Sequence, residues 1–303
     1  MQHAAWITQV LAEADALGVG VDPVETAVPG LSIARSREAG VMRHMLYQPV
    51  FCLVLQGEKQ LLQGPQTLRL TAGQGLIVSF EMPALSHVVG ASREQPYLAL
   101  ALALELDVLR ELAVGLPDSL GSGADEAIGQ LATVGPVFPP LYDAMARLFA
   151  LLREPAALPL LAPLIRREIY YRLLTGPQGA ALRDLLAAEG HAARIARAIT
   201  VMRGAVAARL SIPELARVAG MSVSGFHEHF RHVTAMTPLQ FHKSLKLLEA
   251  RRLLMAGGEG VAGAAYAVGY ESPTHFSRDY ARLFGTSPQR DQRRQRALAT
   301  AGG

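Results

Sequence analysis

The stretch SVSGFHEHFRHVTAMTP (residues 222–238) recurs in pattern as SPTHFSRDYARLFGTSP (residues 272–288), 50 positions further along the chain. Serine opens both copies, aromatic residues stand at the fifth and ninth positions, and Thr-Pro or Ser-Pro closes them. A short alanine-rich segment that ends in glycine precedes each copy. Because chance does not repeat a spaced pattern in register over 17 positions, the copies represent one structural unit present twice.

Each copy, with the alanine-rich segment before it, is predicted to form a helix-turn-helix unit. Glycine ends the first helix, and Ser222 or Ser272 can accept a hydrogen bond from a free amide in the first turn of the second helix. Phe226, Phe230 and Val233 recur at i, i+4 and i+7, the spacing of a buried stripe. Such units place their second helix in the major groove, so the repeat predicts a DNA-binding domain.

The face opposite the buried stripe carries polar side chains near the start of each second helix, where base edges are read. Arg278 suits the paired acceptors of guanine, and Glu228 suits the amino group of cytosine. Any amphipathic helix has a polar outer face, so both interpretations stay open for Arg282 and His229, and His275 can equally cap or support its helix. The predicted DNA-contacting residues are Ser222, Ser224, His227, Glu228, Arg231, Lys243, Thr274, His275, Ser277, Arg278 and Arg282.

The segment between the two units, Pro238–Met255, is predicted to be one helix, since proline fits a first helical turn. At ~1.5 Å per residue, its 18 residues span about 27 Å, near the ~34 Å of one DNA turn. A rigid helix of this length would let one chain read two successive segments of the major groove. We expect Lys243 and its basic neighbours to divide between phosphate contacts and solubility.

Charge is divided unevenly along the chain. Residues 1–190 hold 13 Lys/Arg and 19 Asp/Glu, while residues 191–303 hold 16 Lys/Arg and 7 Asp/Glu. The front part is therefore acidic and the back part basic, which is typical of a module that meets a polyanion, although a solvated basic surface gives the same count. The single cysteine, Cys52, fits a reducing compartment. Without a signal peptide or a 20-residue apolar run, we expect a cytoplasmic protein with no membrane partner.

Residues from about 195 to 290 resemble the paired helix-turn-helix domain of the AraC/XylS family. The marks are Leu215–Ser222, Phe226–Phe230, Thr237–Phe241, Glu249–Leu253, Val268–Arg278 and Phe284–Pro288. Gly225 departs from the family, which usually has a larger residue there, and this weakens the first recognition helix by roughly 1 kcal/mol or less. The resemblance implies that Ser224, His227, Glu228, Thr274, Ser277 and Arg278 face the bases.

The resemblance reaches forward to the N-terminal domain of one subfamily of AraC-type regulators. Its marks are Tyr47–Gly57, Val78-Ser79 followed by Pro83, Ala91-Ser92, Pro96–Leu100 and a linker helix at Leu164–Gly179. It implies a cupin-like β-barrel that senses a signal, here a small-molecule effector of unknown identity. It further implies a homodimer that regulates transcription with RNA polymerase, as an activator, which is the commoner role in the family.

The residues of the front part fit this expectation. Short strand signals with Gly/Pro punctuation across residues 20–105 predict a small barrel or sandwich, and residues 107–190 turn helical. We therefore predict an α+β multidomain protein with a β-barrel sensor at 1–106, a helical linker and dimerisation region at 107–190, and an all-α paired helix-turn-helix domain at 191–295. Some apolar residues of the linker form either a dimer contact or a packing face against the barrel: Leu160, Leu161, Leu164, Ile165, Tyr171 and Leu174.

A few polar groups in an apolar cavity would suffice to bind an effector. The candidates are His44, Tyr47, Gln56, Ser79, Glu81 and His87, each of which is more often a satisfied structural residue. Arg43 and Arg69 are candidates for an anionic effector, with surface charge as the alternative. No His-x-His pair accompanies His44 or His87, and no motif of nucleophile and base is present, so we expect no metal, no cofactor and no enzyme.

Two alternatives stay open at this point. A cupin-type metal enzyme with a DNA-binding tail would hold stoichiometric iron, zinc or manganese. An architectural DNA binder without sequence preference would expose cations alone, and the outward carboxylate of Glu228 argues against it.

Overall fold

The computed structural model describes residues 2–20, 22–40, 42–63, 66–117, 132–187, 190–257 and 259–301. The chain divides into two compact units. The first takes most of the residues up to Ala193, and the second takes those from Arg194 on together with two short strand segments, Arg43–Leu46 and Pro83–Leu85.

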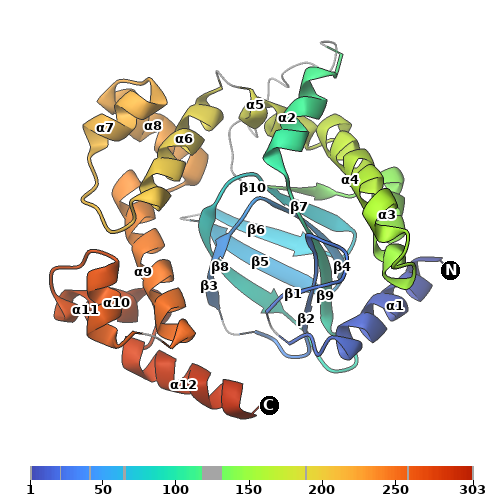
Figure 1. Ribbon diagram of the computed structural model, residues 1–303, viewed down its shortest axis with the longest axis horizontal. Coiled ribbons are helices and arrows are strands. Elements are labelled where there is room, and N and C mark those ends of the chain that lie inside the picture. The colour runs from blue at the N-terminus through green and yellow to red at the C-terminus, as the bar shows by residue number, and fades with distance from the viewer. Residues whose placement is uncertain are drawn as a thin grey trace. The chain divides into compact units, whose positions relative to one another are not determined.

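The β-rich part consists of two sheets (Figure 1). The six-stranded sheet has the order β1 (Val24–Glu25), β2 (Leu31–Ser36), β9 (Tyr97–Ala103), β4 (Val50–Gln56), β7 (Gln74–Val78), β10 (Ala132–Pro136). The four-stranded sheet has the order β3 (Arg43–Tyr47), β8 (Met82–Val89), β5 (Glu58–Gln63), β6 (Gln66–Thr71). The expected barrel is thus two separate sheets that are not closed into one continuous ring of hydrogen bonds.

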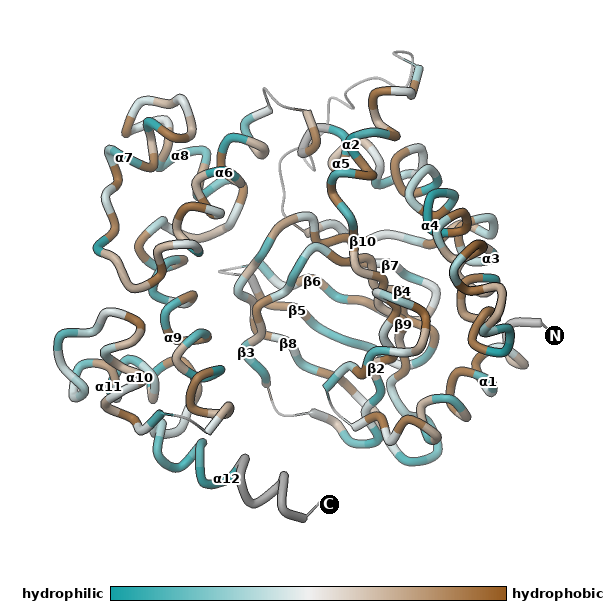
Figure 2. Tube along the Cα trace, in the orientation of Figure 1, coloured by the Kyte–Doolittle hydropathy of each residue, from teal (hydrophilic) through white to brown (hydrophobic). Residues whose placement is uncertain are grey.

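The central strand β9 shows why this sequence forms a sandwich. It pairs antiparallel with β2 on one side and with β4 on the other. Its residues Leu98, Ala99, Leu100 and Leu102 are all buried, so both of its faces are covered. A continuous apolar run, rather than an alternating one, is typical of such a strand. Figure 2 shows apolar residues along β4, β7 and β9.

Helices accompany the six-stranded sheet. They are α1 (Gln2–Ala16), α2 (Leu106–Val114), α3 (Pro139–Ala150) with a 3-10 turn at Leu151–Arg153, α4 (Leu158–Thr175) and α5 (Gly179–Leu186). Helix α4 contacts α2, α3 and α5. The rings of Trp6 and Tyr142 meet edge to face, with centroids 4.6 Å apart, and attach α1 to α3.

Two elements differ from the sequence-based expectation. Helix α1 was not predicted from the sequence. Its polar residues are spaced so that the side chains of Val10 and Ala14 face the core. Strand β10 lies within the stretch expected to be helical, where Ala132–Pro136 pairs with Gln74–Val78 of β7. This pairing makes β10 the edge strand of the six-stranded sheet. Because the two paired strands are far apart in the sequence, no local pattern in residues 107–190 indicates it. Residues 118–131 of that stretch lie outside the described residues.

Apart from its two short strand segments, the second unit is helical. It comprises α6 (His191–Gly204), α7 (Ile212–Ala219), α8 (Val223–Thr234), α9 (Pro238–Ala256), α10 (Val261–Ala267), α11 (Pro273–Phe284) and α12 (Pro288–Ala301). The pairs α7–α8 and α10–α11 are the two predicted helix-turn-helix units, and both are confirmed. Helix α9 contacts α8 on one side and α10, α11 and α12 on the other, so it joins the pairs (Figure 1).

Candidate nucleic-acid interface

The buried stripe of α8 orients the helix. Phe226, Phe230 and Val233 are buried, as their spacing predicted. The ring centroid of Phe230 lies 5.4 Å from those of Phe226 and Phe241, and the Phe230 and Phe241 rings meet edge to face. Aromatic contacts of this geometry add about 0.5–1.5 kcal/mol to the burial of their area. With these rings fixed on α9, the opposite face of α8 is held toward solvent.

The second recognition helix, α11, is held in the same way. Phe276 and Tyr280 are fully buried and pack with Leu247, Leu254 and Val268 in one apolar cluster. The two units therefore have equivalent cores, each built around α9. The repeat seen in the sequence corresponds to a repeat in packing.

Serine side chains start both recognition helices, as predicted. The Ser222 hydroxyl accepts a hydrogen bond from the Gly225 amide at 3.2 Å, and the Ser272 hydroxyl accepts one from the His275 amide at 3.5 Å. The hydroxyls of Ser222 and Ser224 lie 3.3 Å apart. Caps of this kind stabilise a helix by about 1 kcal/mol. They also leave the remaining amides of the first turn directed outward, where a phosphate could accept from them.

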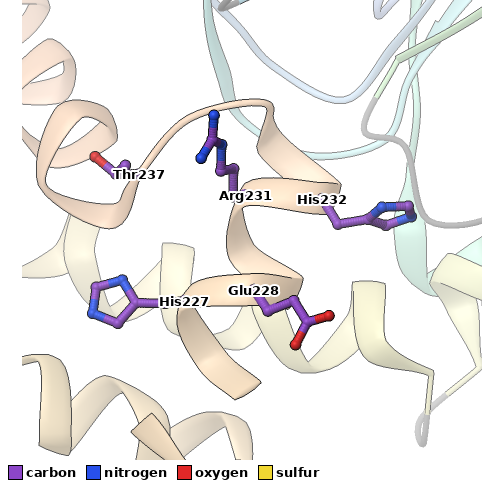
Figure 3. Close-up of a pocket in the computed structure, with 5 residues that line it drawn as sticks. All are labelled: His227, Glu228, Arg231, His232 and Thr237. Atoms are coloured by element: carbon purple, nitrogen blue, oxygen red, sulfur yellow. The ribbon is translucent and has the colours of Figure 1, made fainter. Parts of the chain in front are cut away.

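The predicted base-facing residues of α8 are exposed. Ser224, His227, Glu228 and Arg231 all lie on the solvent side. A shallow hollow of about 540 Å³ is lined by His227, Glu228, Arg231 and His232 of α8 and by Thr237, the N-cap of α9 (Figure 3). The hollow thus combines donors, an acceptor and two imidazoles on one short stretch of helix.

On α11, Thr274, His275, Arg278 and Arg282 are exposed, and Ser277 is half-buried. Arg278 and Arg282 are four residues apart and so share one helix face. Within the described part of the chain, neither of them, nor Arg231, pairs with a carboxylate. These guanidinium groups therefore carry uncompensated positive charge where a polyanion would approach.

Lys243 is placed differently from the other predicted cations. Its ammonium lies 2.7 Å from a carboxylate oxygen of Asp279, an ion pair between α9 and α11. The pair offsets the charge that a phosphate contact would use. A phosphate contact by Lys243 stays a prediction, and in this structure the side chain instead connects two helices.

The six candidate effector residues are spread over the β-rich part. Tyr47 ends β3 and is buried, and Ser79 and Glu81, which lie between β7 and β8, are buried as well. Gln56 donates through Nε2 to the Pro96 carbonyl at 2.8 Å, a structural contact. His87 on β8 is half-buried.

His44 belongs to the strand segment that groups with the second unit, and its ring packs edge-on against that of Phe284 at 5.3 Å. Burial lowers the pKa of His44. Arg69 forms a two-point ion pair with Glu58 on the neighbouring strand, with contacts of 2.6 and 2.7 Å. The contacts described for Gln56 and His44 are with residues outside the candidate set, and the effector site formed by the six residues stays a prediction.

Comparison with known families decides the class of protein. The model of the AraC-type transcriptional regulator N-terminus matches residues 27–181, and a helix-turn-helix domain model matches residues 215–294. The first match alone spans half of the chain. The chain belongs to the AraC family of transcriptional regulators.

Curated relatives within the AraC family match over the helix-turn-helix part. The MmsAB operon regulatory protein of Pseudomonas aeruginosa is 34% identical over 95 residues, which is 31% of this chain and 31% of that protein. The HTH-type transcriptional activator RhaS of an Enterobacter species is 30% identical over 101 residues, covering 33% of this chain and 36% of RhaS. The chain thus spans about a third of the length of these relatives.

Solved structures match over nearly the whole AraC-type architecture. An apo form of ToxT from Vibrio cholerae superposes with a TM-score of 0.56 at 7% identity and covers 88% of this chain and 98% of its own. ToxT solved with an unsaturated fatty acid bound gives a TM-score of 0.54 at 8% identity, with 86% and 94% covered. At these identities the likeness shows a shared fold.

One group of residues in this AraC-family chain was not predicted from the sequence. Lys59, Cys52 and Tyr97 lie near Tyr47 within the β-rich part. The sequence held a signal for it, because Lys59 and Leu61 are two residues apart on a strand and therefore share one face.

Among the described residues, no three His, Cys, Asp or Glu side chains are grouped closely enough to hold a metal ion. No described helix is both long enough and apolar enough to span a bilayer.

Proposed function

We propose that this AraC-family chain is a sequence-specific DNA-binding regulator of transcription. Its helices α8 and α11 read two successive segments of the major groove on one face of the duplex. The observation that carries the proposal is the duplicated, outward-facing polar surface on one helical unit. Helix α9, with 19 residues, is about 28 Å long, close to one DNA turn. Base contacts come from Ser224, His227 and Glu228 on α8 and from Thr274, Ser277 and Arg278 on α11.

The test is binding of the purified chain to fragments of its own upstream region at two salt concentrations, with unlabelled random DNA as competitor. We expect protection of a discrete site that survives the competitor, with affinity falling as salt rises. Binding that random DNA removes completely, with cell extract present to supply any effector, would contradict sequence-specific recognition.

The β-rich part is proposed to sense a small molecule. Its match to the AraC-type N-terminal model supports this role, and ToxT, which shares the fold, has been solved with a fatty acid bound. An effector that binds one arrangement of sensor and DNA-binding parts more tightly shifts the population toward it. We further propose activation through RNA polymerase, in keeping with the activator RhaS among the relatives.

A homodimer is proposed through α4. Leu160 and Leu164 are 74% and 63% exposed and lie one helical turn apart, while Leu161 and Tyr171 are exposed nearby. Leu174, in contrast, is fully buried in its own unit. The exposed apolar residues of α4 are therefore available for a dimer contact, whereas Leu174 packs within the unit. An exposed apolar stripe of this kind is typical of a helix that packs against a partner.

No observation favours the alternative of a cupin-type metal enzyme, since the described residues offer no metal-binding group. Measurement of the metal content of the purified protein tests it directly.

A further inference from the structure

Gly225 is the third residue of the first recognition helix, α8. Its amide donates to the Ser222 hydroxyl that caps the helix, and its φ does not lie in the left-handed region that favours glycine. Glycine is the least favourable residue in a helix after proline, because it loses the most backbone freedom when the helix forms. Gly225 therefore weakens α8, and its presence needs a reason.

Packing within the helical unit does not supply that reason. Among the described residues, a Cβ at Gly225 would meet only the hydroxyl oxygen of Ser222 within 4 Å, at 3.2 Å. The equivalent position of α11 is occupied by His275, whose amide donates to the capping hydroxyl of Ser272 in the same way. The fold therefore accepts a side chain beside a serine cap, and the second unit carries one.

The position of Gly225 around the axis of α8 is on the outer side of the helix. At about 100° per residue, Gly225 lies roughly 140° from the buried Phe230 and roughly 60° from Glu228. His227 lies roughly 160° from it, and Figure 3 shows the side chains of His227 and Glu228 leaving α8 in different directions. Gly225 is thus at one edge of the predicted base-facing surface, where it leaves the helix backbone uncovered.

The edges of a helix in the major groove face the two DNA strands. The groove is about 12 Å wide and a helix with its side chains is about 10–12 Å across, so the helix has little spare room. Residues at the centre of the inserted face meet base edges, whereas residues at its margin meet sugars and phosphates. A position without a side chain at the margin lets the helix backbone approach one strand more closely.

We propose that Gly225 is the place where α8 lies directly against the deoxyribose backbone of one DNA strand. Gly225 is a positioning residue and reads no base itself. Its contact sets how closely the helix approaches the groove wall, and with it the reach of Ser224 and Glu228 to the base edges. This inference rests on the proposed DNA recognition and adds the residue that sets the depth of the first recognition helix.

Gly225→Ala tests the proposal, because stability and DNA binding should change in opposite directions. Alanine favours the helix, so Tm of the free full-length chain should stay the same or rise by up to about 5 °C. The added methyl group would occupy the space of a sugar, so the affinity for the DNA fragment that the wild type protects should fall about tenfold or more. An affinity within about twofold of the wild type overturns the proposal, and so does a Tm that falls together with the affinity.

Gly204→Ala is the matched control. Gly204 is the last residue of α6, it is exposed, and a Cβ there would meet nothing within 4 Å among the described residues. The substitution makes the same chemical change in a helix that carries none of the predicted DNA-contacting residues, so DNA affinity should stay unchanged. A loss equal to that of Gly225→Ala would assign the effect to the helical unit as a whole and overturn the proposal.

Hydroxyl-radical cleavage of the bound fragment reports contacts with individual sugars. The wild type should protect sugars of one strand in the segment read by α8. Gly225→Ala should lose that protection and keep the protection in the segment read by α11. Protection that is lost equally in both segments, or in neither, contradicts a local contact at Gly225.

A fragment with deoxyuridine in place of thymidine in the α8 segment separates a sugar contact from a base contact. The loss caused by Gly225→Ala should be the same on both fragments. A loss that disappears without the thymine methyl groups shows that the glycine faces a base, and the sugar contact is then wrong. A wild type that protects no discrete site rejects the proposed recognition itself, whereas wild-type protection with unchanged binding by Gly225→Ala rejects this inference alone.

Discussion

The hydroxyl of Tyr280 donates a hydrogen bond to the carboxylate of Asp291 at 2.8 Å, and this bond connects the recognition helix α11 to α12. Arg251 of α9 donates to the same carboxylate oxygen through Nε at 2.9 Å. Asp291 is only 4% exposed, so three helices meet at one buried charge. The orientation of α11, and with it that of Arg278, depends on a residue outside the repeated motif.

We expect Asp291→Ala to destabilise the helical unit by about 2–4 kcal/mol, because it leaves Arg251 and the Tyr280 hydroxyl without their acceptor. Tyr280→Phe removes a single hydrogen bond and should cost about 1 kcal/mol. Urea denaturation of both variants and of the double variant measures the coupling. Additive effects of the two changes would show that Tyr280 and Asp291 do not act together.

Two glycines in equivalent turns make a matched pair. Gly220 and Gly269 both have positive φ, +62° and +76°. A Cβ on Gly220 would touch nothing within 4 Å, whereas one on Gly269 would lie 1.9 Å from the carbonyl oxygen of Ala207. We therefore expect Gly220→Ala to cost about 1–2 kcal/mol from backbone strain, and Gly269→Ala to cost a further 1–3 kcal/mol or so from the clash. Thermal unfolding of the two variants measures the difference, and equal losses would contradict it.

His242 on α9 makes stability depend on pH. Burial is the main cause that lowers its pKa, and the nearby Lys246 adds to the effect, while a hydrogen bond to the Val206 backbone opposes both. As pH falls below about 6.5, the unfolded chain takes up a proton before the folded one does. Stability should therefore fall from pH 7.5 to 5.5, by at most about 1.4 kcal/mol per pH unit from this group.

The variant His242→Gln can still donate an N–H and should show a smaller loss between the two pH values in urea denaturation. His227→Gln, which changes an exposed histidine, is the control and should behave as the wild type. A pH dependence that is the same in all three chains would assign it to other groups.

The sequence predicted the helical unit better than it predicted the β-rich one. The caps, the buried Phe226–Phe230 stripe and the joining helix follow from local spacing, which a single chain displays directly. Strand β10 and the Lys59 group depend on which strands become neighbours, and pairing across long stretches of sequence leaves no local pattern. The ion pair of Lys243 with Asp279 also joins residues far apart in sequence, so the charge of Lys243 alone indicated only a phosphate contact.

Arg278 and Lys243 are expected to differ in their effect on DNA binding. Arg278→Ala should weaken cognate binding by about 1–3 kcal/mol and relax specificity at one base pair, since its guanidinium is exposed and has no carboxylate partner among the described residues. Lys243→Ala should weaken cognate and random DNA alike. The salt dependence of binding to both DNAs is measured for each variant, and equal losses on cognate and random DNA for Arg278→Ala would contradict its assigned role.

Substitutions in the exposed apolar stripe of α4 are expected to change the oligomeric state. The double variant Leu160→Asp with Leu164→Asp should be monomeric in analytical ultracentrifugation at a concentration where the wild type is dimeric. Its stability should change by only about 0.5 kcal/mol, since both side chains are exposed. Leu239→Asp, an equally apolar and exposed position on α9, should leave the mass unchanged. A wild type that is monomeric at micromolar concentration would refute the α4 contact.

The close approach of Gly269 to Ala207 has a consequence for the target sites. The turn of the second helix-turn-helix unit rests on the loop that leads into the first, and α9 packs against both. This contact leaves the two helix-turn-helix units little room to move relative to each other. Insertion of a single base pair between the two recognised DNA segments would rotate one segment by about 35° relative to the helix that reads it. Such an insertion should abolish binding even though every contacted base is intact. The site read by one chain should therefore be found in a genome as an ungapped motif of constant length, with no variable spacer between the segments read by α8 and α11.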